Sequence, residues 1–117
     1  MKQADRAVIE RMIRYCEEIE RFMDRFGKRF DDYCGDQAYQ YATSMCVIQI
    51  GELVARLSNE TLLETPSIPW RLIRGMRNIY AHNYDRTKPE TMWQTLTEDI
   101  PQLRSQLQEL LISDSAE

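Results

Sequence analysis

Apolar side chains recur at helical spacing along most of this chain. Between residues 4 and 26 they fall at steps of three and four, and charged residues fill the positions between them. This spacing predicts an amphipathic helix that ends where Gly27 follows it. A second periodic stretch follows Asp36, a preferred helix cap, and runs to about residue 57. The first half of the chain therefore predicts two long helices.

The second half of the chain predicts two further helices. One spans residues 68–81, with Ser67 as its cap and Pro69 in its first turn. The other spans residues 87–112 and contains Pro101, which removes a backbone donor and clashes one turn back, so a kink is expected there. Residues 113–117 are expected to fray. Because no segment alternates like a strand, the sequence predicts an all-α fold, an antiparallel bundle of four main helices in one domain, residues 1–117.

Composition narrows the classes of function. The formal net charge of −4 gives no general attraction to nucleic acid or to an acidic membrane surface, so binding of either kind needs a local patch. Residues 2–6 are mostly polar or charged and precede no apolar signal region, and no run is long enough to span a membrane. Three cysteines without C-x-x-C spacing favour a reducing interior, and one histidine gives no zinc site. We expect a cytoplasmic protein without metal or cofactor.

A local basic patch does occur, on the predicted helix 68–81 and the loop after it. On a helical wheel of about 100° per residue, one arc is apolar and is expected to face the core: Leu72, Ile73, Met76, Ile79 and Tyr80. The opposite arc carries Arg71, Arg74, Asn78 and His82, and Arg77 and Tyr84 fall on the margin. No carboxylate interrupts these cations before Asp85, and Arg86 and Lys88 follow it. Such a patch suits a ligand that carries phosphate.

His82, the only histidine, suits proton transfer near neutral pH. Arg77 can clamp a phosphodiester, Tyr84 can stack on a base, and Asn78, one turn before His82, can orient the imidazole. Together these side chains suggest metal-independent cleavage of RNA. The plainer interpretation is that His82 only complements the helix dipole and that the arginines only solubilise the surface.

Arg77 and His82 lie about 140° apart around an ideal helix. A straight helix therefore does not aim both at one phosphate. Either the helix unwinds near His82, or the two side chains meet across a dimer. Gly75 favours the dimer, because it lets a second helix come close.

These residues resemble a known family. Arg77-Asn78-x3-His82-x-Tyr84 is similar to the Arg-x4-His-x-Tyr motif of HEPN domains. The segments Ile68-Pro69-Trp70, Gly75-Met76 and Ile50-Gly51-Glu52 resemble the HepT group of toxins.

The resemblance implies an all-α homodimer with a cleft between protomers, and a metal-independent ribonuclease toxin with Arg77 and His82 catalytic and Asn78 supporting. It implies a nucleotidyltransferase antitoxin of the MntA type, which would neutralise the toxin by AMPylation of Tyr84. Added bulk and negative charge beside the arginines would then block RNA. Two alternatives remain: a non-catalytic helical accessory protein that binds a nucleotidyltransferase or a nucleotide, and a purely structural helical dimer.

Overall fold

The computed structural model describes residues 1–116, with side chains up to residue 115. Within residues 1–116 the chain is helical and has no strand, which confirms the all-α prediction. The α-helices are α1 (Gln3–Phe26), α2 (Phe30–Cys34), α3 (Gln37–Val54), α4 (Asn59–Glu64), α5 (Trp70–His82), α6 (Pro89–Gln94) and α7 (Ile100–Ala116). No helix among these residues is long and apolar enough to cross a membrane.

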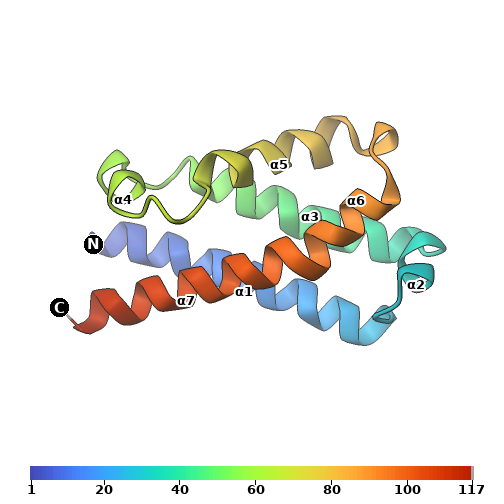
Figure 1. Cartoon of the computed structure of the whole chain (residues 1–117), viewed down its shortest axis with the longest axis horizontal. Coiled ribbons are helices and arrows are strands. Elements are labelled where there is room, and N and C mark those ends of the chain that lie inside the picture. Colours follow the sequence, from blue (N-terminus) through green and yellow to red (C-terminus); the bar gives the residue numbers. More distant parts are fainter. Residues whose placement is uncertain (117) are drawn as a thin grey trace.

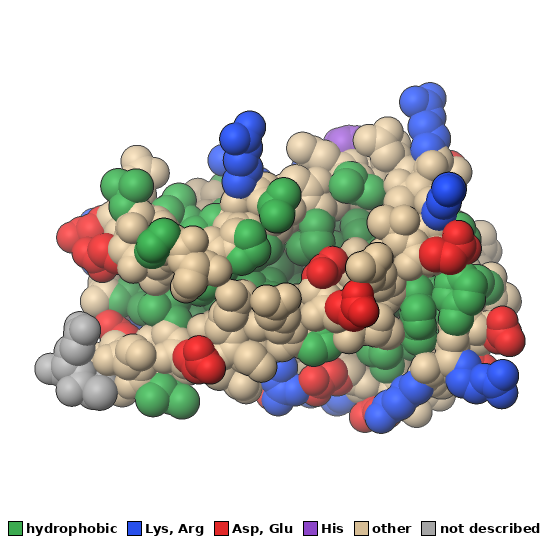
Figure 2. Space-filling view, in the orientation of Figure 1, with side chains coloured by type: hydrophobic (Ala, Val, Ile, Leu, Met, Phe, Trp, Pro, Cys, Tyr) green, Lys and Arg blue, Asp and Glu red, His purple; other side chains and the backbone are tan. Residues whose placement is uncertain are grey.

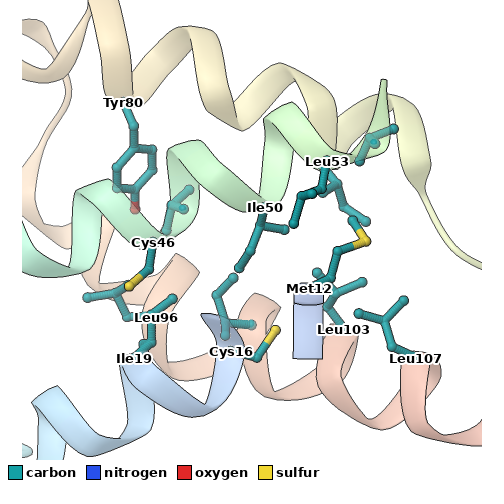
Figure 3. Close-up of a cluster of buried hydrophobic side chains, with 14 of the residues drawn as sticks. Met12, Cys16, Ile19, Cys46, Ile50, Leu53, Tyr80, Leu96, Leu103 and Leu107 are labelled. Carbon is teal, nitrogen blue, oxygen red and sulfur yellow. The ribbon is translucent and has the colours of Figure 1, made fainter. Parts of the chain in front are cut away.

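The four long helices α1, α3, α5 and α7 lie side by side and alternate in direction, so both termini reach the same end of the bundle (Figure 1). α3 packs along both α1 and α5, and α1 also packs along α7. In Figure 3, apolar side chains from α1, α3 and the C-terminal segment converge on one interior, and Tyr80 reaches in from α5. The predicted antiparallel bundle is therefore confirmed.

The first two long helices follow the sequence closely. α1 buries Ile9 and Cys16 completely within its apolar stripe and ends at Gly27, whose φ of 119° favours glycine. The Asp36 side chain accepts a hydrogen bond from the backbone of Tyr39 and caps α3, as predicted. α3 ends at Val54, earlier than expected.

α5 differs from its prediction at its start and on its apolar face. It begins at Trp70 with Pro69 as its cap, and Ser67 does not cap it. Of the predicted core arc, Ile73 and Tyr80 are buried, but the side chains of Leu72 and Ile79 are 72% and 40% exposed. The physical reason is that α5 packs mainly against α3, so part of its apolar arc stays uncovered.

The predicted last helix is interrupted before Pro101. α6 is followed by one turn of π-helix, Thr95–Asp99, in which the backbone N–H of Ile100 bonds to the carbonyl of Thr95. This wider turn accommodates a proline that has no N–H and would crowd the preceding turn. The predicted fraying of residues 113–116 is wrong, because Asp114 binds the N-terminus and Arg6 at 3.0 Å each and α7 continues to Ala116. Glu117 lies outside the described residues.

One buried carboxylate joins the start of α1 to the start of α4. Asp5 is 3% exposed and accepts hydrogen bonds from the Ser58 hydroxyl at 2.6 Å, the Ser58 backbone at 3.0 Å and the Thr61 hydroxyl at 2.7 Å. Burial by itself raises the pKa of Asp5, but these hydrogen bonds outweigh it and hold the pKa below its usual value.

Replacing Asp5 by alanine should lower the free energy of unfolding by about 2–3 kcal/mol, because three donors lose a charged acceptor. Glu64→Ala, an exposed position without an ion pair, should change it little. Because the pKa of Asp5 is lower in the folded protein than in the unfolded chain, its ionised form stabilises the fold at pH values above the ordinary pKa of aspartate. This contribution is lost as the pH falls through the pKa that Asp5 has in the folded protein. The difference between wild type and Asp5→Ala in urea titrations should therefore shrink in acid, and a constant difference would contradict this assignment.

Candidate active site

The site begins with a close approach of two helices. A Cβ atom added to Gly51 of α3 would lie 2.6 Å from the Cβ of Arg77 and 3.2 Å from the carbonyl oxygen of Ile73, both on α5. Any larger residue at position 51 would push α5 outward. The consequence is that Arg77 leaves α5 directly beside Glu52.

The guanidinium of Arg77 connects three other side chains. Its Nε donates to the carboxylate of Glu52 and forms an ion pair with it. Its Nη1 lies 3.2 Å from Oδ1 of Asn78 and 3.2 Å from Nε2 of His82. The predicted catalytic pair therefore meets within one chain, and Asn78 supports Arg77 rather than orienting His82.

This meeting requires neither of the two arrangements that the helical wheel suggested. α5 continues through His82, and its end at Asn83 is closed by a hydrogen bond to the carbonyl of Ile79. The wheel describes only the direction in which each side chain leaves the helix. The long stem of Arg77 then bends along the surface and covers the angle to His82.

The contact also assigns a role to one ring nitrogen. A guanidinium has only donors, so in this hydrogen bond Nε2 of His82 is the acceptor. Once Arg77 turns toward an anion, Nε2 is free to take a proton from a substrate hydroxyl.

Unpaired cations flank this cluster. Among the described residues, Arg71, Arg74, Arg86 and Lys88 have no carboxylate within ion-pair distance, and all four are exposed. Figure 2 shows basic side chains on both sides of the histidine along the upper edge of the molecule. A hollow of about 250 Å³ between α3 and α5 is lined by Gly51, Glu52, Ala55, Arg74, Arg77 and Asn78. The patch is less purely cationic than the sequence suggested, because α3 contributes Glu52.

Tyr84 lies in a short 3₁₀ turn, Tyr84–Arg86, and is half-buried. Its hydroxyl donates to Oε1 of Gln40 at 3.1 Å and lies 3.4 Å from the hydroxyl of Tyr33. Burial, with the hydrogen bond to Tyr84, raises the pKa of Tyr33. The Tyr84 hydroxyl thus faces a cavity of about 230 Å³ beside α2 and α3.

Sequence reasoning missed three residues around this site. Gln40 and Tyr33 leave no local signal, since 44 and 51 residues separate them from Tyr84. Glu52 does have a local signal, because it directly follows Gly51, the glycine that marks where a neighbouring helix approaches. Gly75, predicted at a dimer interface, has nothing within 4 Å of an added Cβ and faces open space in the single chain.

An all-α bundle that brings the arginine, asparagine and histidine of an Arg-x4-His-x-Tyr motif together at an exposed basic surface defines the HEPN class of protein. The family model described as "Ribonuclease HepT-like" matches residues 12–110. The chain therefore belongs to the HepT-like ribonuclease family, as the sequence predicted.

Individual relatives agree with this assignment. A protein of Thermococcus cleftensis named "Probable ribonuclease HepT" is 30% identical over 110 residues, 94% of this chain and 98% of the relative. A protein of Caldanaerobacter subterraneus subsp. tengcongensis named as an RNase is 32% identical over 107 residues, 91% of this chain and 93% of the relative. No solved structure gives a significant match.

Proposed function

We propose that this protein is a metal-independent endoribonuclease, the toxin of a toxin–antitoxin pair, and that it acts in the cytoplasm of a bacterium or archaeon. The observation that carries the proposal is the contact of 3.2 Å between Arg77 Nη1 and His82 Nε2 on an exposed surface. The family assignment supports RNA as the substrate. No group of three or more potential metal ligands occurs among the described residues, and the proposed chemistry uses none.

In the proposed reaction, a phosphodiester draws the guanidinium of Arg77 away from His82. His82 Nε2 then accepts the proton of the 2′-hydroxyl, the 2′-oxygen bonds to phosphorus, and the bond to the 5′-oxygen breaks. The leaving 5′-oxygen takes up a proton from the His82 imidazolium that this step has formed, which returns the histidine to its starting state. Arg77 offsets the charge that develops on the phosphate oxygens, and Arg71 and Arg74 hold neighbouring phosphates.

We further propose that the enzyme is a homodimer formed through α5. Leu72, Gly75, Met76 and Ile79 follow each other at steps of three, one and three, which places them along one exposed side of the helix. Leu72, Met76 and Ile79 border an apolar hollow of about 450 Å³ between α5 and α7, where Figure 2 shows green side chains. Because His82 lies one turn beyond Ile79, at the edge of this side of α5, two such faces packed together would put both histidines beside one groove.

The proposed antitoxin is a nucleotidyltransferase of the MntA type that transfers AMP to Tyr84. The Tyr84 oxygen attacks the α-phosphorus of ATP, pyrophosphate leaves, and the phenol proton is released. The Tyr84 hydroxyl is bonded to Gln40, so this hydrogen bond has to break before transfer. The added phosphate would then compete with RNA for the nearby arginines.

Purified wild-type protein should cleave single-stranded RNA in the presence of a metal chelator. His82→Ala should lower the rate by about 10²–10⁴-fold because it removes the proton acceptor. Arg77→Ala should lower it by about 10²–10³-fold because it removes the charge on the phosphate. Arg14→Ala, an exposed arginine on α1, is the matched control and should cleave normally.

Unchanged cleavage by folded His82→Ala and Arg77→Ala would remove the assigned mechanism. A folded wild-type dimer without any cleavage, but with stable binding to a nucleotidyltransferase, would favour the non-catalytic accessory protein instead.

Leu72→Asp should convert the dimer to a monomer in sedimentation velocity runs, with the dissociation constant raised at least about 100-fold, because a charge would be buried at the interface. Leu63→Asp is the matched control, since Leu63 on α4 is 80% exposed and lies outside the α5 face. A wild-type monomer at micromolar concentration would contradict the proposed dimer.

Tyr84→Phe should fold normally, with a loss of about 1 kcal/mol for one hydrogen bond. It should also gain no AMP when it is produced together with the nucleotidyltransferase. Intact-mass spectrometry should find one AMP on wild type and on Tyr41→Phe, a control at an exposed tyrosine. AMP on Tyr84→Phe would show that another residue is modified.

A further inference from the structure

We propose that Glu52 is a positioning residue for the ribonuclease site, and that it acts by holding Arg77 through Nε. This inference rests on the proposed function, because it concerns the same catalytic arginine. The carboxylate bonds Nε, while Nη1 of the same guanidinium faces Asn78 and His82. Among the described residues, Nη2 has no partner and is free for a phosphate oxygen.

The backbone explains why this carboxylate and no other takes the role. Gly51 brings α3 so close to α5 that its added Cβ would meet Arg77 Cβ at 2.6 Å. The next residue, Glu52, therefore starts beside the stem of Arg77 and needs no long reach. Nε of the arginine is therefore held by α3, while Nη1 contacts two residues of its own helix and can exchange His82 for a phosphate.

Stability does not account for the pair. The side chains of Arg77 and Glu52 are 36% and 48% exposed, and ion pairs of that exposure contribute little to folding. A carboxylate beside the phosphate site also opposes the binding of RNA. An ion pair that adds little stability and disfavours the ligand is best explained by its effect on the orientation of Arg77, since an arginine that samples many rotamers seldom presents Nη1 and Nη2 together to a phosphate. The charge of Glu52 also offsets the charge of Arg77 beside a histidine that must accept a proton.

The test compares Glu52→Ala with Glu52→Gln in steady-state cleavage of RNA. Glu52→Ala should lower kcat by about 10–100-fold with KM unchanged or lower, because a misplaced catalytic group slows the chemical step. Glu52→Gln keeps an oxygen that accepts from Nε and should recover most of kcat. Asp85→Ala removes an exposed carboxylate that does not bond to the guanidinium of Arg77, and it should keep kcat. The thermal midpoints of all three should stay close to that of wild type.

A double-mutant cycle separates positioning from a general structural role. If Glu52 acts only through Arg77, adding Glu52→Ala to Arg77→Ala should cause no further loss. An equal loss in both backgrounds, or full activity of Glu52→Ala, would overturn the inference while leaving the ribonuclease assignment intact. Failure of the ribonuclease assignment would instead appear as wild-type protein that cleaves no RNA.

A second readout does not depend on activity. The Nε–H of Arg77, assigned in nitrogen–proton spectra by its loss in Arg77→Lys, should exchange slowly with water in wild type. It should exchange markedly faster in Glu52→Ala and stay slow in Asp85→Ala. Equal exchange in wild type and Glu52→Ala would show that the carboxylate does not hold the guanidinium, and would overturn the inference.

Discussion

The close contact between α3 and α5 at Gly51 is the constraint on which the site depends. The missing side chain lets α5 approach until an added Cβ would lie 2.6 Å from the Cβ of Arg77. Since α3 is the principal neighbour of α5, this contact sets the register of the helix that carries the motif. The positions of Arg77, Asn78 and His82 relative to Glu52 follow from it.

One-sided packing gives α5 three different surfaces. Ile73 and Tyr80 face the interior, the arginines and His82 face solvent, and Leu72 and Ile79 leave apolar area exposed. Large apolar patches on a protein surface mark interaction sites. The same helix therefore supports the fold, the proposed chemistry and the proposed dimer, and a change at its contact with α3 would affect all three.

The predicted grouping of side chains came close to their arrangement in the structure because these residues lie on one helix. The spacing of Arg77, Asn78 and His82 already grouped them, and the resemblance to HEPN domains named the pair. The wheel failed for Arg77 and His82 because it treats a side chain as a direction, whereas the arginine stem spans much of the angle between them. It failed for Leu72 because an apolar arc predicts burial without saying how many neighbours are present.

The sequence by itself determined the helical fold, the end of α1 at Gly27, the start of α3 after its Asp36 cap, and the identity of the basic motif. These features depend on local periodicity and on backbone preferences of neighbouring residues. The tertiary structure decided that Glu52 holds Arg77 and that Gln40 binds the Tyr84 hydroxyl. Those partners lie 25 and 44 residues away along the chain. Only the packing of α5 and the following turn against α3 brings them together, and the residues around Arg77 and Tyr84 do not indicate which partner each will meet.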